Sequence, residues 1–402
     1  MGPTPKIIVF SSLFPNAVRP GGGLFIRERM FRVGQELPLT VVSPVPWFPG
    51  QTLIRLWKPN YRPTPATMEE QLGVTVHFPR FLSVPSLFRQ FDGLSMAVCS
   101  WWLVRRLQKE GYNLLDAHFA YPDGYAATLL GRWLKLPVAI TLRGTEVPTA
   151  KSPPKLSRMM AGLAAAQRVF AVADSLKRHV VSLGADVAKI LVVGNAVDTS
   201  VFHPVDKAEA RRALGIPDDA LVLVSVGALV ERKGFHRVIE ALPGLRAKYP
   251  NLHYLAVGGV GPEGDFSGRL EQQVAELGLE NAVHFLGAMK PAELKGPLSA
   301  ADVFVLATSN EGWANVFLEA MACGLPVVTT DVGGNPEVVC RQDLGTIVPF
   351  GDAPALQAAL DRALSFPWDR EGIVEYAKAN SWDRRVAVLV REFRELVERF
   401  YG

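Results

Sequence analysis

The chain has 402 residues, of which 49% are hydrophobic and 20% are charged. At roughly 150 residues per domain this length predicts two or three domains, and the composition is that of chains that fold around a core, so global disorder is excluded. Three cysteines, Cys99, Cys323 and Cys340, are too few and too scattered for a disulfide framework or a zinc site. We therefore expect a reducing, cytoplasmic compartment.

Neither a secretion signal nor a membrane span is predicted. The apolar run at 7–10 is too short for the core of a signal peptide. The longest uncharged stretch, residues 37–54, contains four prolines, which a membrane-spanning helix of about 20 residues would not tolerate.

Positive charge is concentrated in the first half of the chain. Residues 1–203 contain 23 Lys and Arg against 12 Asp and Glu, whereas residues 204–402 contain 20 against 27. The resulting charges of +11 and −7 predict that the first half faces something anionic, such as lipid headgroups, a phosphorylated lipid or nucleic acid.

Short β-rich apolar runs alternate with amphipathic helical stretches along the whole chain. This pattern predicts parallel sheets built from βαβ units and an open α/β architecture. The predicted strands lie at 6–10, 39–43, 74–78, 114–118, 138–142, 168–171 and 190–193, and then at 221–226, 253–257, 283–286, 303–306, 326–329 and 346–348.

The segment 194–204 contains Gly, Asn and Pro and is typical of a crossing between domains. We place the boundary at Pro204, which gives a first domain of 1–203 and a second of 204–380. Residues 381–402 form a separate helical pattern with apolar residues at three- and four-residue steps. One face of this helix is expected to be buried against the first domain.

The strongest candidate for a ligand site lies after the predicted strand at 303–306. A loop there leads into a helix that begins at Asn315 and ends at a Gly-Leu-Pro sequence. Ligands of open α/β sheets bind outside the carboxyl ends of strands. The free amides of Val316 and Phe317 are therefore predicted to face an anion such as phosphate.

Two glutamates bracket this predicted anion site. Glu311 precedes the helix and Glu319 lies within it. Carboxylates beside a phosphate repel it unless they accept hydrogen bonds from hydroxyl groups, which a sugar and a ribose would supply. Either glutamate alone is explained as a favourable charge at a helix start or as a solvated side chain. The pair, with the helix start between them, favours binding.

A cationic pair follows the predicted strand at 221–226. Arg232 and Lys233 lie between Gly227 and Gly234, and a loop there can bring both side chains to the same edge of the sheet. They would neutralise a diphosphate leaving group. The alternative is that both are solvated surface charges, which is the usual place of such residues.

Weaker candidates lie elsewhere. Gly22 and Gly23 open a helix after the first strand and allow backbone amides to approach a ligand, although a plain turn fits as well. His118 ends the strand at 114–118 and is expected to face the second domain, although a single His is more often structural. Residues 258–264 imitate a dinucleotide fingerprint, but Pro262 and the absence of a predicted helix afterwards favour a loop that touches a nucleotide.

Taken together, these motifs resemble the retaining, nucleotide-sugar-dependent glycosyltransferases of family 4, which have the GT-B fold. The resemblance extends from the glycine turn to the final helix, and its sharpest mark is the E-x7-E element from Glu311 to Glu319. Supporting marks are Arg-Lys-Gly at 232–234, Asn-Ala-Val-Asp at 195–198 and Thr-Leu-Arg-Gly-Thr-Glu at 141–146. The resemblance implies two Rossmann-like, doubly wound domains that face a central cleft.

The resemblance also implies a role for each candidate residue. Glu311 would bind hydroxyls of the transferred sugar, Glu319 the ribose, and Arg232 and Lys233 the diphosphate. Further donor contacts would come from the backbone of Asn315, Val316 and Phe317, from Gly22 and Gly23, from His118 over the sugar and from Met289 near the base. Arg143 and Asp123 would lie on the acceptor side. No metal is expected, since such enzymes are metal-independent and no D-x-D motif is evident.

The sequence departs from the family at two positions. Ala228 stands where the family often has Arg, so Arg232 would supply that charge, and Arg143 stands where many members carry His. By the implied mechanism the acceptor hydroxyl attacks from the face that the nucleotide leaves, and the departing phosphate oxygen takes the proton. Domain closure would exclude water.

An aromatic and basic stretch in the first half suggests where the acceptor comes from. Aromatics between 78 and 102 alternate with cations, which suits the headgroup region of a membrane. The other interpretation is a helix whose apolar stripe faces the core; that stripe would be Phe91, Leu94, Val98, Trp101 and Trp102. Contact with the inner face of the plasma membrane would make a lipid-linked saccharide or a lipopolysaccharide core the acceptor.

Three other functions remain open at this point. A nucleotide-sugar epimerase shares the architecture but leaves the E-x7-E element unexplained. A glycan-binding or nucleic-acid-binding module would use the basic half, although no nucleic-acid motif is present. A phosphorylase of similar fold would need inorganic phosphate in place of a nucleotide. The donor base, the sugar, the linkage and the oligomeric state are not predicted.

Overall fold

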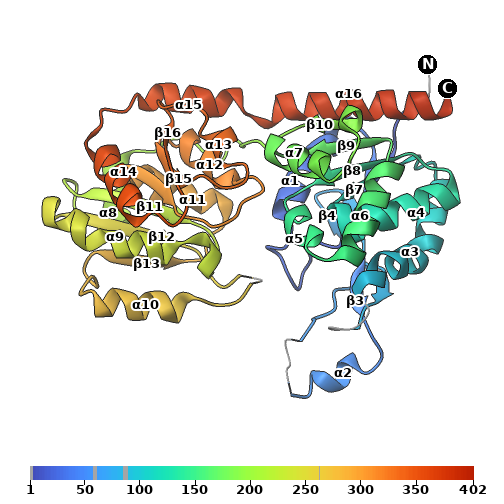
Figure 1. Cartoon of the computed structure of the whole chain (residues 1–402), viewed down its shortest axis with the longest axis horizontal. Coiled ribbons are helices and arrows are strands. Elements are labelled where there is room, and N and C mark those ends of the chain that lie inside the picture. Colours follow the sequence, from blue (N-terminus) through green and yellow to red (C-terminus); the bar gives the residue numbers. More distant parts are fainter. Residues whose placement is uncertain (1–2, 58–60, 85–88, 262) are drawn as a thin grey trace. The chain divides into compact units, whose positions relative to one another are not determined.

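The computed structural model describes residues 3–57, 61–84, 89–261 and 263–402 (Figure 1). The chain divides into two compact units. The first comprises Met1–Asn195 together with Asp383–Gly402, and the second comprises Ala196–Trp382. No helix in the described part of the chain is long and apolar enough to cross a membrane.

The first unit is built around an eight-stranded sheet with the order β10-β9-β8-β7-β1-β2-β5-β4, in which only β4 runs antiparallel to its neighbour. A separate two-stranded sheet pairs β3 with β6. The strands are β1 (Ile7–Phe10), β2 (Leu39–Val42), β3 (Val45–Trp47), β4 (Met68–Gln71), β5 (Val74–His77), β6 (Arg80–Leu82), β7 (Leu114–His118), β8 (Val138–Leu142), β9 (Arg168–Ala171) and β10 (Ile190–Val192).

Helices cover both faces of this sheet. The helices are α1 (Leu24–Glu36), α2 (Gln51–Ile54), α3 (Asp92–Lys109), α4 (Tyr125–Leu134), α5 (Glu146–Ala150), α6 (Pro153–Ala165), α7 (Asp174–Ser182) and α16 (Trp382–Tyr401). Ile7 and Val9 share one core with α1 and α16. Because side chains alternate along a strand, the residues between them face the other side, which α3, α4 and α6 cover as a packed layer.

The second unit contains a six-stranded, wholly parallel sheet with the order β13-β12-β11-β14-β15-β16. Its strands are β11 (Leu221–Val226), β12 (Leu252–Val257), β13 (Val283–Gly287), β14 (Val303–Leu306), β15 (Val327–Thr330) and β16 (Gly345–Val348). Its helices are α8 (Lys207–Leu214), α9 (Phe235–Lys248), α10 (Ser267–Glu276), α11 (Pro291–Ala300), α12 (Asn315–Ala322), α13 (Asn335–Val338), α14 (Ala353–Ser365) and α15 (Arg370–Ala379).

Alternation along β11 shows how the second sheet is buried on both faces. Val222 and Val224 belong to one core, which includes side chains of α11, α12 and α15. Leu223 belongs to the other, which includes side chains of α9, α10 and α14. A continuous apolar run is typical of such a strand. Both units are Rossmann-like, as predicted.

All strands predicted from the sequence are present, with ends that shift by at most one residue. Three strands were not predicted. β3 and β6 have only three residues each, and β4 has the polar sequence Met-Glu-Glu-Gln at the edge of the sheet. The hydrophobic pattern marks buried strands and gives no signal for these.

The division between the units falls eight residues before the predicted boundary at Pro204. Val197 and Phe202 are buried in the core of the second unit, and the Val197 amide donates to the Asn380 carbonyl at 3.3 Å. The crossing segment therefore belongs to the second unit, because its apolar side chains pack there.

The interpretation of α3 as a helix whose apolar stripe faces the core is wrong. Leu94, Val98 and Trp102 are exposed by 42%, 56% and 74%. The side that packs inward is a different set of residues, namely Gly93, Met96, Ala97, Ser100, Val104 and Leu107. A Cβ atom at Gly93 would lie 2.9 Å from the ring of Tyr125, so the close approach of the helix at this position requires glycine.

Candidate functional site

In each unit two adjacent strands mark the point where the strand order reverses. These are β11 and β14 in the second unit, and β1 and β7 in the first. The loops after such a pair of parallel strands emerge at the same edge of the sheet and diverge, which leaves space for a ligand. Most of the predicted site residues follow these four strands.

In the second unit, the side chain of Glu311 collects three donors. Its Oε1 atom lies 2.6 Å from Lys233 Nζ, 3.2 Å from Arg232 Nη1 and 3.2 Å from Thr308 Oγ1. The Lys233 and Glu311 side chains are only 16% and 10% exposed. The structure therefore brings the predicted cationic pair onto the predicted sugar-binding carboxylate.

Arg232 joins this cluster to a third loop. Its guanidinium group contacts both carboxylate oxygens of Glu263, at 2.7 Å from Nη2 to Oε1 and 2.9 Å from Nε to Oε2. It also donates to the Asn310 carbonyl at 2.8 Å. The hydrogen bond with Glu263 is the main cause that raises the pKa of Arg232 above its usual value. Arg232 is thus held as a cation by two loops.

Two glycines permit this close approach of loops. Gly234 has φ +77°, and a Cβ atom there would lie 2.0 Å from the Ala307 carbonyl oxygen. Gly333 has φ +53°, and its Cβ would lie 1.7 Å from the Glu311 carbonyl oxygen. Since only glycine tolerates both this backbone conformation and these contacts, the two residues fix where Lys233 and Glu311 meet.

The glycine-rich loop at 258–264 also belongs to this edge. The Leu229 amide donates to the Gly259 carbonyl at 2.8 Å. The expectation that no helix follows is wrong, because α10 begins at Ser267, where the Asp265 carboxylate accepts from the Ser267 amide at 3.0 Å. Pro262 lies outside the described residues.

The helix α12 begins at Asn315 as predicted, but its first turn differs from the prediction in one respect. The Phe317 amide donates to the Ala314 carbonyl at 3.2 Å, so the prediction that this amide is free is wrong. The Phe317 side chain is fully buried against Phe304. Glu319 lies in the second turn and is partly buried.

Val316 and Met289 lie at the margin of the core. Both are partly buried and pack against the core cluster that includes α12. Met289 belongs to the loop between β13 and α11, so it lies after another strand of the same sheet. Their predicted contacts with the donor stay predictions.

In the first unit, the loops after β1 and β7 are tied together by Asp123. Its carboxylate accepts hydrogen bonds from the amide and from the hydroxyl group of Ser12, the latter at 3.1 Å. Asp123 is 1% exposed. Burial raises its pKa to about 7, although the two hydrogen bonds from Ser12 act in the opposite direction.

His118 ends β7 as predicted and is enclosed by polar groups of its own unit. Its Nδ1 atom lies 3.0 Å from Arg143 Nη2, and its Nε2 atom lies 3.3 Å from Asp116 Oδ2. Burial lowers the pKa of His118 to about 4, so the imidazole is neutral at physiological pH. The ring is fully buried, and the expectation that it faces the second domain stays a prediction.

Arg143 is the centre of this polar group. It donates to Asn195 Oδ1 at 2.9 Å, and its guanidinium carbon lies 5.2 Å from the centroid of the Phe25 ring. Burial lowers the pKa of Arg143. The residue that replaces the family's usual His is therefore partly buried and bound to groups of its own unit.

The glycine turn before α1 is a tight, internally bonded structure. Gly23 has φ +75°, and a Cβ atom there would lie 2.4 Å from the Leu13 carbonyl oxygen. The Gly22 amide donates to the Arg19 carbonyl at 3.1 Å. The turn therefore requires glycine at Gly23, and its predicted approach to phosphates stays a prediction.

Two family models match the chain, one to each unit for the most part. The model described as "Glycosyltransferase Family 4" matches residues 54–201, and the one described as "Glycosyl transferases group 1" matches residues 206–380. Together with the two Rossmann-like units, these matches decide the family. The chain belongs to the GT4-like glycosyltransferases.

Relatives agree with this assignment. The chain is 28% identical over 366 residues to the Bacillus subtilis (strain 168) protein named "Putative teichuronic acid biosynthesis glycosyltransferase TuaC", covering 89% of this chain and 88% of the relative. It is 37% identical over 219 residues to the D-inositol 3-phosphate glycosyltransferase of Corynebacterium urealyticum, covering 52% of each chain.

Solved structures share the fold along the whole chain. Sucrose-phosphate synthase from Thermosynechococcus elongatus aligns with a TM-score of 0.78 at 22% identity, over 99% of this chain and all of that one. Anabaena HepE in complex with UDP-glucose aligns with a TM-score of 0.69 at 19% identity, over the same shares. At such identities the likeness shows the fold.

The structure of this GT4-like glycosyltransferase also reveals residues that the sequence analysis did not assign. Glu146 is buried and accepts hydrogen bonds from the amides of Gly144, Ala120 and Arg143 at 2.7, 3.3 and 3.4 Å. Burial raises its pKa. It fixes the loops after β7 and β8, and its only sequence signal was its place at the end of the 141–146 motif.

Thr308, Glu263 and Ser12 were missed for a different reason. Each is a common polar residue in a loop, and only the fold shows which carboxylate or guanidinium group it meets. In the described ranges no three His, Cys, Asp or Glu side chains are grouped so that they would hold a metal ion. The metal independence of this enzyme stays a prediction.

Proposed function

We propose that this GT4-like enzyme is a retaining glycosyltransferase that transfers a sugar from a UDP- or GDP-linked donor to a hydroxyl group of a saccharide or lipid-linked saccharide. Two comparisons support this choice of substrates. HepE, which has the same fold, was crystallised with UDP-glucose. The Bacillus subtilis relative is named for teichuronic acid biosynthesis. Bacterial polysaccharide or envelope glycan synthesis is the corresponding role.

The observation that carries the proposal is the cluster of Glu311 with Lys233 and Arg232 at the reversal point of the second sheet. Arg232 and Lys233 are two cations at one edge of the sheet, and cations of this kind pair with the diphosphate of a nucleotide sugar. Arg232 is also paired with Glu263, so a bound diphosphate would take the place of a carboxylate at this guanidinium group. Glu311 Oε1 already accepts three hydrogen bonds, and its remaining acceptor capacity suits sugar hydroxyls. The cations would stabilise the departing diphosphate without a metal ion.

We propose the other donor contacts from a nucleotide sugar whose diphosphate lies at Arg232 and Lys233. Glu319 would bind the ribose, the backbone of Asn315 and Val316 would approach the phosphates, and Met289 would lie near the base. Gly22 and Gly23 would contribute from the first unit. His118 would lie over the sugar as an uncharged ring, with its two nitrogens held by Arg143 and Asp116. Arg143 and Asp123 are proposed for the acceptor side.

In the proposed reaction the acceptor hydroxyl oxygen forms a bond to the anomeric carbon on the face from which the nucleotide departs. The bond between that carbon and the phosphate oxygen breaks, and the phosphate oxygen takes the hydroxyl proton. No protein nucleophile takes part, and the configuration at the anomeric carbon is retained. Arg232 and Lys233 balance the negative charge that develops on the departing diphosphate.

The experiment that tests this function is transfer from UDP-glucose, GDP-mannose and ADP-glucose to a panel of saccharide and lipid-linked acceptors in the presence of a chelator. The anomeric proton of the product, followed by NMR, should show the donor's configuration at the first time point. An inverted product, or a sugar trapped covalently on a side chain, contradicts the retaining mechanism. Conversion of the donor without any acceptor would indicate an epimerase.

We further propose that the enzyme works at the cytoplasmic, inner face of the plasma membrane. The +11 charge of residues 1–203 supports this proposal, since anionic lipid attracts such a surface.

A further inference from the structure

One surface of the first unit exposes apolar side chains that a free surface would normally avoid. On α3 these are Leu94, Val98 and Trp102, at 42%, 56% and 74% exposure. They recur at four-residue steps and therefore share one side of the helix. The opposite side of α3 is buried in the unit, so the exposed side is not needed for folding.

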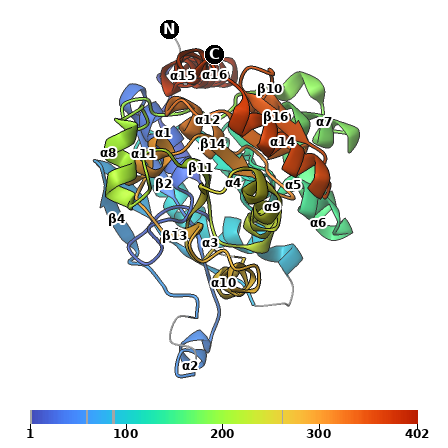
Figure 2. The ribbon, with the colours of Figure 1, turned by 90° about the vertical axis from the view of Figure 1, so that its left-hand side faces the viewer.

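The short helix α2 and the residues after it also expose large apolar side chains, and to a greater extent. Its first residue, Gln51, is buried and donates to the Arg62 carbonyl at 3.1 Å. Leu56 and Trp57, which come after the helix and its C-cap Arg55, are 73% and 81% exposed. Polar groups therefore hold this segment to the unit while its large apolar side chains point to solvent. Figures 1 and 2 both show α2 projecting away from the sheets of the first unit.

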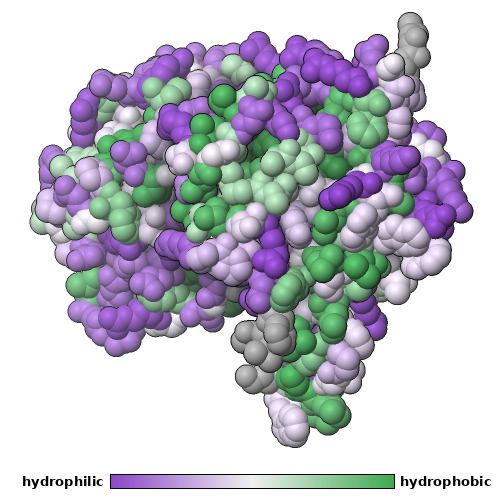
Figure 3. All heavy atoms as spheres, turned by 45° about the vertical axis from the view of Figure 1, so that its right-hand side comes forward, coloured by the Kyte–Doolittle hydropathy of each residue, from purple (hydrophilic) through white to green (hydrophobic). Residues whose placement is uncertain are grey.

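The end of β6, at Leu82 and Ser83, is hydrogen-bonded both to α3 and to the segment that carries α2. Leu82 is 50% exposed, and its carbonyl accepts from Ser95 of α3 at 2.8 Å. The neighbouring carbonyl of Ser83 accepts from Arg62, the residue that holds α2, at 2.9 Å. We call Leu56, Trp57, Leu82, Leu94, Val98 and Trp102 the apolar face. In Figure 3 hydrophobic side chains gather on the projection that carries α2.

Cations lie over aromatic rings of α3 and the turn before it, one of which, Trp102, belongs to the apolar face. The guanidinium carbon of Arg105 lies 5.0 Å from the ring centroid of Trp101 and 6.0 Å from that of Trp102. Arg158 lies 5.1 Å from the ring of Phe91. Residues 45–110 contain eight Lys and Arg against four Asp and Glu. Phe88 lies outside the described residues.

We propose that the apolar face is a membrane-docking surface, which inserts at the headgroup level of an anionic bilayer. Exposed tryptophan and leucine bordered by arginine is the composition of interfacial segments, in which the rings lie at the acyl boundary and the cations contact lipid phosphates. The charge favours this occupant over a second copy of the chain, since two such faces would bring their arginines together. Docking here goes beyond sugar transfer and identifies the part of the unit that meets the lipid.

The test is flotation of the full chain with vesicles of phosphatidylcholine alone and of phosphatidylcholine mixed with phosphatidylglycerol. The wild type should bind the mixed vesicles, and high salt should weaken the binding because it screens the arginines. Trp57→Glu and Val98→Glu should each lower the partition coefficient at least about tenfold, because each places a charge in the apolar layer. Val187→Glu is the matched control, since Val187 is 54% exposed in the same unit and precedes β10, at the other sheet edge from β4.

Three results would overturn the proposal. The first is a wild type that binds neither kind of vesicle. The second is binding by Val98→Glu equal to that of Val187→Glu. The third is self-association of the wild type, seen by sedimentation, that Trp57→Glu and Val98→Glu abolish while vesicle binding is unchanged. Vesicle binding is measured without donor or acceptor, so its failure and a failure of glycosyl transfer are separate results. Unchanged melting temperatures would show that the variants fold.

Discussion

Lys233 and Glu311 form an ion pair of 2.6 Å in which both side chains are largely removed from solvent. They follow β11 and β14, the two strands between which the order of the second sheet reverses. The pair therefore joins two loops whose separation defines the predicted donor site. Because charge in a partly dry site acts more strongly than in water, each partner is expected to matter for the reaction.

Glu311→Gln tests this pair with almost no change in shape. The substitution removes the charge that Lys233 and Arg232 balance, and it weakens the hydrogen bonds that we assign to the sugar. We expect the rate of transfer to fall by about 10²–10³. The measurement is kcat and KM for the nucleotide sugar, with the variant's melting temperature as a check on folding.

Lys248→Met is the matched control for the charge at Lys233. Lys248 forms an ion pair of similar length with Asp361, but both partners are well exposed. Lys248→Met should leave transfer unchanged, whereas Lys233→Met should reduce it as strongly as Glu311→Gln. Equal effects of the two lysine variants would show that Lys233 has no special part in the reaction.

Gly234→Ala is expected to destabilise the second unit and to reduce donor binding together. The added Cβ would lie 2.0 Å from the Ala307 carbonyl oxygen, so the loop that carries Lys233 must move. We expect a loss of about 3 kcal/mol or more. Gly215 provides the comparison, because it also has a positive φ but has no atom within 4 Å of the added Cβ. Gly215→Ala should cost only about 1 kcal/mol, as measured by calorimetry.

Asp123→Asn should change how stability depends on pH. The pKa of Asp123 is about 7 in the folded unit against 3.8 as the ordinary value. Between these values the folded state holds a proton that the unfolded state has lost, so this group's contribution to stability falls as pH rises from about 4 to about 7. Asn cannot ionise, so the stability of the variant relative to the wild type should increase as pH rises across this window, by up to about 4 kcal/mol.

The melting temperatures of the wild type and of Asp123→Asn between pH 4.5 and 8 provide the measurement. The contribution of His118 to stability changes with pH in the opposite direction, because its lowered pKa makes stability rise over roughly pH 4 to 6.5. It is present in both proteins and cancels in their difference. A difference that stays constant with pH would show that Asp123 ionises normally.

The final helix α16 should contribute to the stability of the first unit through Phe393. This side chain is fully buried and packs edge-on to Phe170 of β9 at 5.7 Å. Phe393→Ala should cost about 3–5 kcal/mol. Phe400 of the same helix is 40% exposed, and Phe400→Ala should cost under about 1 kcal/mol. Equal shifts in melting temperature would contradict this account of the packing.

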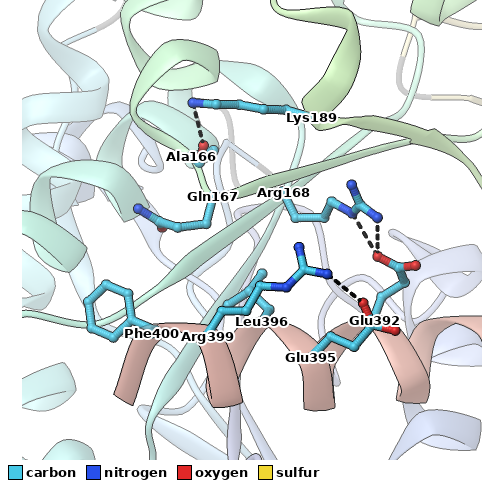
Figure 4. Close-up of a pocket in the computed structure, with 9 residues that line it drawn as sticks. All are labelled: Ala166, Gln167, Arg168, Lys189, Glu392, Glu395, Leu396, Arg399 and Phe400. Atoms are coloured by element: carbon cyan, nitrogen blue, oxygen red, sulfur yellow. Dashed lines mark hydrogen bonds and ion pairs between the residues drawn. The ribbon is translucent and has the colours of Figure 1, made fainter. Parts of the chain in front are cut away.

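The helix α16 also makes a polar contact with the sheet, at the rim of a cavity. The cavity has a volume of about 350 Å³ and is lined by residues of the β9 region and of α16. In Figure 4 Arg168 of β9 points toward Glu392 of α16, and Arg168 Nε lies 2.7 Å from Glu392 Oε2.

Buried parallel strands were predictable from the sequence because each is a continuous apolar run with a turn signal behind it. β7 and β14, for example, begin and end where the pattern predicts. The exposed side of α3 was not predictable, because helical spacing of apolar residues indicates a shared side but not what covers it. Its small inward residues, such as Gly93, gave a signal only once the Tyr125 ring was placed.

The candidate site was predictable as a set of loops after strands. The identities of Glu311, Arg232 and Lys233 followed from charge next to glycine and a helix start. What the sequence did not provide was the pairing of side chains across loops far apart in the chain. Glu263 meets Arg232 across 31 residues, and Ser12 meets Asp123 across 111. Such contacts depend on sheet topology, which a single chain's pattern does not specify.

The central claim is that the second unit binds a nucleotide sugar through Glu311, Glu319 and the two cations. Its most direct test is a thermal-shift titration with UDP, GDP, ADP and their sugar conjugates, in chelator, on the wild type and on Glu319→Ala. We predict that one nucleotide raises the melting temperature of the wild type and that the variant loses this shift. If no nucleotide stabilises the wild type, with chelator or with magnesium, the claim is contradicted.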